Sequence, residues 1–176
     1  LIDKEIEHAR SGKSAGIFLK MNSLEDKALI RKLHDASRAG VHVRLIVRGI
    51  CCLIPGVVGM SPHVEAISIV DRFLEHSRVF VFTNAGKPAV YLSSADWMGR
   101  NLDRRIEVAF PILDHTLQQR IIDLMELQWA DRVKARSINI AQTNPYRSSD
   151  RDMKRTRSQP ATRRYLQRAN SEPKRR

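Results

Sequence analysis

The sequence predicts a single α/β domain in which helices flank a mixed β-sheet, followed by a basic tail. An alternating apolar run at 15–21, an amphipathic stretch at 24–39 and an apolar run at 41–47 form a β-α-β pattern. A connecting helix of this length favours parallel pairing of the two strands. Two further runs, 78–82 and 89–92, flank a short Gly-containing loop, which predicts an antiparallel hairpin. Because both kinds of pairing occur in one chain, a mixed sheet is expected.

Other patterns complete this domain. The further expected elements are a helix at 3–10, strands at 66–70 and 105–112, and a helix at 115–131. Asp114 directly precedes the last of these helices, and Asn22 or Ser23 precedes the helix at 24–39, so these side chains are the expected N-caps. Residues 137–144 carry no clear periodicity and are expected to form a connector.

Charge divides the chain into two regions, 1–145 and 146–176. The 176 residues carry a net charge of +12, and the second region holds 11 Lys and Arg against three acidic residues, so it accounts for +8. A basic segment with few apolar residues buries too little surface to offset the entropy of ordering. We therefore predict one folded domain at 1–145 and a disordered tail at 146–176. Such a tail could bind polyanions, with nucleic acid as a less favoured ligand.

Several classes of protein are disfavoured. No apolar run approaches the ~18 residues that span a membrane. Cys51 and Cys52 are adjacent, without a CxxC pair or a zinc-ligand pattern, which favours a reducing cytoplasm. Contact with the inner membrane face is a further option for so basic a chain. Neither a P-loop nor a GxGxxG stretch is present.

The chain begins at Leu1, and we expect it to be an internal piece of a longer protein.

The predicted hairpin brings polar residues together at one end of the sheet. His76 and Arg78 stand where its first strand begins, and Ser94 and Asp96 follow the end of its second strand. These two ends are neighbours in an antiparallel pair. Arginine binds phosphate oxygens in a bidentate fork, and histidine can act as a nucleophile or as an acid. The set predicts phosphoryl-transfer chemistry, with Asp96 or Glu75 as a carboxylate that could fix the His76 tautomer.

Arg48 and Gly49 form a second candidate site. They follow the apolar run at 41–47, at the carboxyl end of a predicted parallel strand. Ligands of open α/β sheets bind at this edge. Arg48 is thus a candidate phosphate ligand, and Gly49 would allow the main chain to approach closely. Trp97, by contrast, is expected to lie in the core.

Several long blocks of sequence resemble polyphosphate kinase, and they occur in the family's order. The blocks are 16–22, 47–56, 68–78, 90–98 and 105–108. The resemblance extends from residue 1 to about residue 146. It implies a phospholipase-D-like fold and a place as the second of two tandem catalytic domains that share one active site.

The resemblance also implies roles for individual residues. His76 matches the family's second catalytic histidine, and Arg48 matches a ligand of the nucleotide phosphates; Arg78 and Ser94 are expected to assist in phosphate binding. The implied reaction is reversible transfer of the terminal phosphate of ATP to polyphosphate through a phosphohistidine. That histidine and the Mg²⁺ ligands are expected in the remaining domains of the enzyme, with ATP, ADP and polyphosphate as substrates. The family works as an oligomer, commonly a tetramer. Because half of the shared active site is missing, this chain alone should be inactive.

Two alternatives remain open. The first is a phospholipase-D-type phosphodiesterase half-site, whose pattern is H-x-K-x4-D. Here His76 is followed by Arg78 in place of Lys, and Thr83 occupies the Asp position, which disfavours that chemistry. The second alternative is a non-enzymatic module that binds polyanions through the tail at 146–176.

Overall fold

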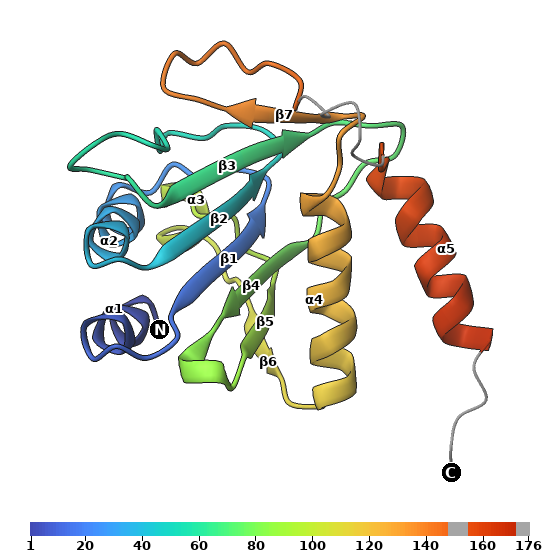
Figure 1. Ribbon diagram of the computed structural model, residues 1–176, viewed down its shortest axis with the longest axis horizontal. Helices are drawn as coiled ribbons and strands as arrows, with labels where there is room; N and C mark the ends of the chain where they lie inside the picture. Colours follow the sequence, from blue (N-terminus) through green and yellow to red (C-terminus); the bar gives the residue numbers. More distant parts are fainter. Residues whose placement is uncertain (148–154, 172–176) are drawn as a thin grey trace.

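A seven-stranded mixed sheet forms the centre of the computed structural model, which describes residues 1–147 and 155–171. Its strands lie in the order β6-β5-β4-β1-β2-β3-β7 (Figure 1). Their bounds are Gly16–Met21 for β1, His42–Val47 for β2, Val64–Ile69 for β3, Arg78–Phe82 for β4, Ala89–Ser93 for β5, Ala109–Ile112 for β6 and Ala135–Ile138 for β7. The predicted α/β class and the mixed sheet are confirmed.

The parallel half of the sheet contains β1, β2 and β3. Helix α2 (Lys27–Arg38) joins β1 to β2, and the register runs from Gly16 opposite His42 to Met21 opposite Val47. This confirms the predicted β-α-β unit. The predicted N-cap of its helix is wrong, because Asp26 accepts the hydrogen bond from the Leu29 amide. Asn22 and Ser23 instead belong to the functional site described below.

The antiparallel half contains β4, β5 and β6. Arg78 pairs with Ser93 and Phe82 with Ala89, which confirms the predicted hairpin and brings its two polar ends together. The loop between the strands includes the short helix η1 (Asn84–Gly86). At the opposite edge, β7 pairs with β3 in part of the stretch expected to be a connector. That prediction is wrong for residues 137 and 138, because the strand is too short to show periodicity.

Helices cover both faces of the sheet. Helices α1 (Ile2–Arg10) and α2 lie on one side, and α4 (His115–Trp129) lies on the other, while α3 (Gly99–Leu102) is a single turn (Figure 1). Asp114 caps α4 as predicted, accepting from the Leu117 amide. Alternate strand residues feed two cores: Leu19 packs towards α1 and α2, and Phe18 packs towards α4. Trp97 is buried in the first core, as expected.

The tail contains a helix, so the prediction of disorder from residue 146 is wrong for a large part of it. Helix α5 (Ser158–Ser171) packs beside α4 (Figure 1). The Tyr165 hydroxyl donates to Asp123 on α4 at 2.7 Å, and Ala161 is buried. Net charge alone missed this helix because the domain supplies acidic and apolar partners for it. The prediction for residues 148–154 and 172–176 lies outside the described residues.

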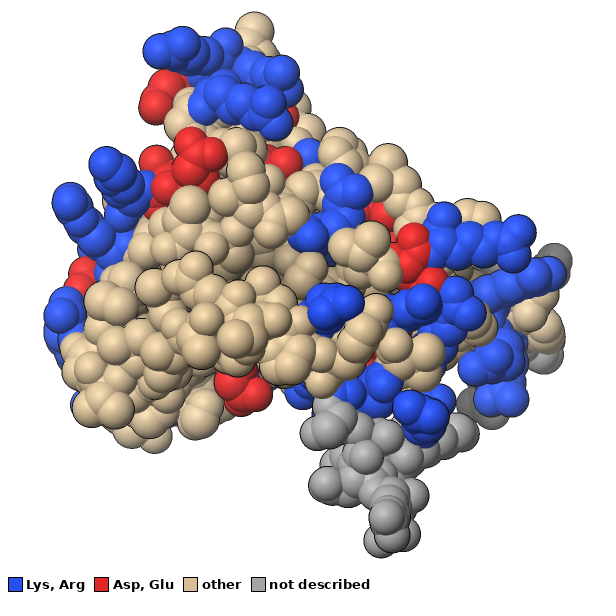
Figure 2. Space-filling model, turned by 90° about the horizontal axis from the view of Figure 1, so that it is seen from above, with Lys and Arg blue, Asp and Glu red and all other residues tan. Residues whose placement is uncertain are grey.

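None of the described helices is both long and apolar enough to cross a membrane. Figure 2 shows Lys and Arg side chains gathered on the side of the molecule that carries α5. The exposed arginines of this helix are Arg163, Arg164 and Arg168.

Candidate functional site

Arg78 and Asp96 form the centre of the site. Arg78 begins β4, and Asp96 lies three residues beyond its pairing partner Ser93. The guanidinium donates to the carboxylate through Nη2 at 2.8 Å and through Nε at 3.2 Å. Asp96 is only 4% exposed. The predicted meeting of the hairpin's polar ends is confirmed, and it fixes the orientation of an arginine.

Asp96 also receives main-chain hydrogen bonds from the end of β1. The amides of Asn22 and Ser23 donate to its Oδ1 at 2.7 and 3.2 Å. Burial by itself raises the pKa of Asp96, but the hydrogen bonds from Arg78, Asn22 and Ser23 outweigh it and hold the pKa below its usual value. Asp96 is therefore a fixed negative charge at neutral pH, and it aligns Arg78.

Arg48 joins the same network. It follows β2, and its Nε donates to the side-chain oxygen of Asn22 at 2.9 Å. The Gly49 amide donates to the main-chain oxygen of Asn22 at 2.8 Å, and a Cβ at Gly49 would approach that oxygen to 3.1 Å. The main chain at Gly49 thus comes close to another segment, as predicted, and that segment is the end of β1. Arg48 and Arg78 are connected through Asn22 and Asp96.

His76 lies against the Arg78 guanidinium. Its Nδ1 is 2.9 Å from Arg78 Nη1, and its Nε2 is 3.2 Å from Nη2. Arginine only donates, and a neutral imidazole has one acceptor nitrogen, so at most one of these contacts is a hydrogen bond. The hypothesis that Asp96 or Glu75 fixes the His76 tautomer is wrong here. Asp96 bonds to Arg78, and Glu75 bonds to Lys20 at 2.6 Å.

Lys20 is a residue of this site that the sequence analysis missed. It lies on β1, is 5% exposed, and pairs with Glu75. Burial lowers the pKa of Lys20, and the neighbouring Glu75 carboxylate partly opposes that effect. The signal in the sequence was a lone charge within the apolar run of β1, facing the same side as Phe18.

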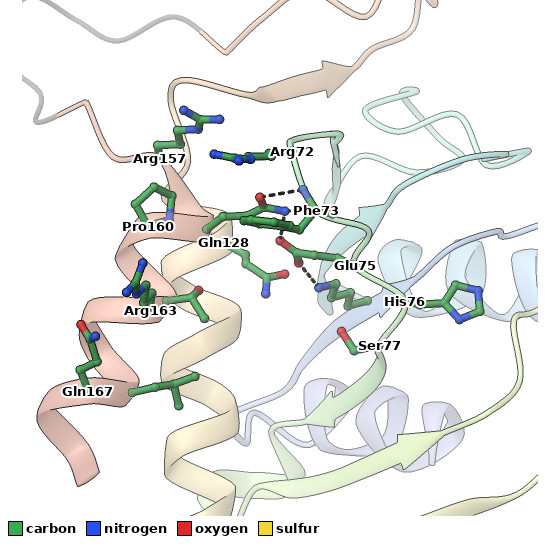
Figure 3. Close-up of a pocket in the computed structure, with 14 residues that line it drawn as sticks. Arg72, Phe73, Glu75, His76, Ser77, Gln128, Arg157, Pro160, Arg163 and Gln167 are labelled. Atoms are coloured by element: carbon green, nitrogen blue, oxygen red, sulfur yellow. Dashed lines mark hydrogen bonds and ion pairs between the residues drawn. The ribbon is translucent and has the colours of Figure 1, made fainter. Parts of the chain in front are cut away.

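A cavity of about 800 Å³ opens beside Lys20 and His76 (Figure 3). The loop at 72–77 forms one wall, and α4 and α5 form the other. Arg48 does not line this cavity and opens instead to a separate hollow of about 310 Å³ beside Arg136. The two predicted phosphate ligands, Arg48 and His76, are therefore connected by hydrogen bonds but face different spaces on this chain.

The Ser94 hydroxyl is already engaged. It donates to Glu107 and accepts from the Val108 amide at 3.0 Å. Glu107 also accepts from Asn101 at 2.5 Å. Both hydrogen bonds lower the pKa of Glu107, and the bond from Ser94 has the larger effect. Glu107 was not predicted, because nothing in the sequence of β6 and its preceding loop marked it as a partner of Ser94.

No metal site is evident in the part of the chain that the structure describes. Within residues 1–147 and 155–171, no three His, Cys, Asp or Glu side chains lie close enough together to hold a metal ion.

The fold defines the class of protein. A crystal structure of Nuc from Salmonella typhimurium, a phospholipase D family member, superposes with a TM-score of 0.55 at 14% identity. The match covers 77% of this chain and 88% of that one. An identity this low establishes the phospholipase-D-like fold and nothing about activity.

The family follows from closer relatives. The family model for polyphosphate kinase C-terminal domain 2 matches residues 1–159, and this chain belongs to that family. Polyphosphate kinase of Vibrio cholerae is 57% identical over 146 residues, which is 83% of this chain and 21% of the relative. The Vibrio parahaemolyticus polyphosphate kinase is 49% identical over 175 residues, or 99% of this chain and 25% of the relative.

A solved polyphosphate kinase has the same fold. The crystal structure from Porphyromonas gingivalis superposes with a TM-score of 0.92 at 48% identity, covering 96% of this chain and 26% of that one. This chain thus spans about a quarter or less of the length of the relatives it matches.

Proposed function

We propose that this chain supplies half of the active site of a polyphosphate kinase. The enzyme would transfer the terminal phosphate of ATP reversibly to polyphosphate through a phosphohistidine. The observation that carries the proposal is the connected set His76, Arg78, Asp96, Asn22 and Arg48. It aligns two guanidinium groups and an imidazole, and the relatives named polyphosphate kinase support the choice of substrates.

Each residue has a distinct role in this proposal. Arg48 and Arg78 would neutralise charge on phosphate oxygens, because a guanidinium matches phosphate geometry with two parallel donors. His76, which is exposed, would give or take a proton at the transferred phosphoryl group. Ser94 would bind a phosphate oxygen only by exchanging its contact with Glu107.

The other half of the site would come from the remaining domains of the enzyme. Those domains would carry the phosphorylated histidine and the Mg²⁺ ligands, and the whole would assemble as a homo-oligomer. Exposed apolar side chains support a covering partner, since Ile106, Val108 and Phe110 are all exposed beside Glu107. A patch of this kind typically marks a surface that another domain covers. The cytoplasmic location stays a prediction.

The phosphodiesterase alternative has less support. Its fold neighbour is only 14% identical, and Arg78 and Thr83 replace the Lys and Asp of the cleavage pattern. Arg78 is also committed to Asp96 by two hydrogen bonds.

Binding of ADP and of polyphosphate to the 176-residue chain tests the proposal. We expect Arg48→Ala/His76→Ala to weaken binding by about tenfold or more, the loss typical of a charge-assisted hydrogen bond. The matched control is Arg31→Ala/His115→Ala, which removes the same two residue types at exposed positions on α2 and α4. Equal affinity for the two double variants would contradict the proposal.

A third variant tests the polyanion-binding alternative. Removal of residues 146–176 would not separate the two hypotheses, because α5 contacts the loop that carries His76. Arg164→Ala/Arg168→Ala removes exposed charge outside the cavity and leaves those contacts in place. If this variant alone abolished binding, with a steep dependence on salt, the polyanion-binding module would be the better description.

A further inference from the structure

The loop that carries His76 has few main-chain restraints. It connects β3 to β4, and among the described residues none of 71–76 forms a hydrogen bond from main chain to main chain. A loop without such bonds is free to open locally unless side chains hold it. His76 stands near the end of the loop, where Arg78 contacts its ring and donates to its main-chain oxygen at 2.9 Å. The side chains that hold the rest of the loop therefore act on the imidazole together with Arg78.

Residues at the start of α5 provide most of the side chains that hold the loop (Figure 3). The Gln159 amide pairs with the main chain of Phe73: its Nε2 donates to the Phe73 oxygen at 2.8 Å, and its Oε1 accepts from the Phe73 amide at 3.1 Å. The same Nε2 lies 3.2 Å from Glu75 Oε1. Just before the helix, Arg157 donates to Asp71 at 2.6 and 2.9 Å. Three alternate loop residues are thus bound from one helix end.

The loop is also anchored to the sheet. Glu75 Oε2 accepts from Lys20 on β1 at 2.6 Å, and Lys20 is buried. Glu75 therefore lies between Gln159 and Lys20, directly before His76 in the sequence. The helix end is itself fixed, because the Ser158 amide donates at 2.7 Å to Asp131, which is fully buried. The Lys20–Glu75 and Ser158–Asp131 contacts at the two ends of this chain are shielded from water, whereas the Gln159–Phe73 pair between them lies at the surface.

We infer that Gln159 is a positioning residue for the proposed phosphoryl transfer. It would act by holding the main chain of Phe73 and the side chain of Glu75, and would not itself touch phosphate. A displacement of about 1 Å at a reacting group can lower a rate by as much as about 10²-fold. The inference rests on the proposed function for its effect on rate, but the restraint on the loop can be measured without any activity.

The test uses Gln159→Leu, which keeps the size of the side chain and removes its amide. The control is Gln119→Leu on α4, an exposed position that does not line the cavity. The first readout is hydrogen exchange of the Phe73 amide in the 176-residue chain. We expect exchange to rise about tenfold in Gln159→Leu, the factor for losing one or two net hydrogen bonds. The melting temperatures of the two variants should stay similar.

The second readout is kinetic, on the complete enzyme that contains this chain. Gln159→Leu should lower kcat about tenfold or more while the KM for ATP changes much less, because a displaced His76 affects the transition state more than substrate binding. Gln119→Leu should leave both constants unchanged. Unchanged exchange at Phe73 would overturn the inference whatever the activity. Faster exchange with unchanged kcat would overturn the positioning role, and inactivity of His76→Ala would then show that the proposed function itself still stands.

Discussion

A buried carboxylate organises the positive charges of this site. Asp96 accepts hydrogen bonds from Arg78 and from the main chain at the end of β1, and Asn22 extends the network to Arg48. Buried ion pairs add little net stability, but the removal of one partner leaves an uncompensated buried charge. A gain in folding stability does not account for the pair, and in the proposed function its role is to align Arg78 as a phosphate ligand.

Replacement of Asp96 should be costly. Asp96→Ala leaves the Arg78 guanidinium and two amides without their acceptor, and we expect a loss of about 3–5 kcal/mol in the free energy of unfolding. Urea unfolding followed by circular dichroism measures this loss. Asp35→Ala is the matched control, because Asp35 pairs with Arg38 at 2.6 Å on the surface, where about 1 kcal/mol or less is expected. Similar losses for both variants would contradict the role assigned to Asp96.

The sequence predicted part of this site through topology. The antiparallel hairpin was enough to infer that His76, Arg78 and Asp96 meet, and a parallel strand end marked Arg48 as a separate candidate. The link between the two through Asn22 is visible only in the structure. Lys20 and Gln159 could not be found in that way. Their roles depend on side-chain contacts between segments that are far apart in the chain, such as the pairing of Gln159 with Phe73.

At the scale of secondary structure, helix α5 and strand β7 both depend on Asp131. Its Oδ1 accepts from the amides of Val133, Lys134 and Ala135, and its Oδ2 accepts from Ser158. One carboxylate therefore shapes the turn into β7 and caps the start of α5. Strongly periodic elements such as α4 and β4 were predicted from sequence, whereas β7 and α5 are stabilised mainly by contacts with the rest of the domain.

Asp131→Ala should release α5. The change removes four main-chain acceptor contacts, and hydrogen bonds to a charged group contribute about 1.5–3 kcal/mol each at most. Limited trypsin digestion reports the release, because α5 contains Arg163 and Arg164, and cleavage there should be much faster in the variant. The control is Asp114→Ala, which removes the N-cap of α4 and should cost only about 1 kcal/mol. Equal cleavage of α5 in both variants would contradict this account.

For the whole molecule, the free energy of unfolding should fall at acid pH. Hydrogen bonds, chiefly from Arg157, lower the pKa of Asp71; at Asp96 and Asp131 burial acts in the opposite direction but is outweighed by hydrogen bonds. A carboxyl whose pKa is lowered on folding stabilises the fold above its unfolded pKa and loses that contribution as pH falls through the folded value. The ordinary value is 3.8, so the loss should begin near that pH.

Urea unfolding at pH 7 and at pH 3 measures this dependence. The wild-type chain should have a clearly lower free energy of unfolding at pH 3. Asp96→Ala should lose less between the two pH values, because one of the contributing carboxylates is absent. A wild-type free energy that is the same at both pH values would contradict the assignment of these three aspartates as charged in the folded protein.

The central claim is that His76 takes part in phosphoryl transfer. The most direct measurement is the rate of polyphosphate formation from ATP by the complete enzyme, wild type beside His76→Ala and His115→Ala. His115 is an exposed histidine at the start of α4, remote from the Arg78 network in the sequence and in its hydrogen bonds. We expect His76→Ala to lower the rate by at least ~10²-fold, as for loss of a general acid, and His115→Ala to leave it unchanged. A His76→Ala enzyme that retained its rate would contradict the claim.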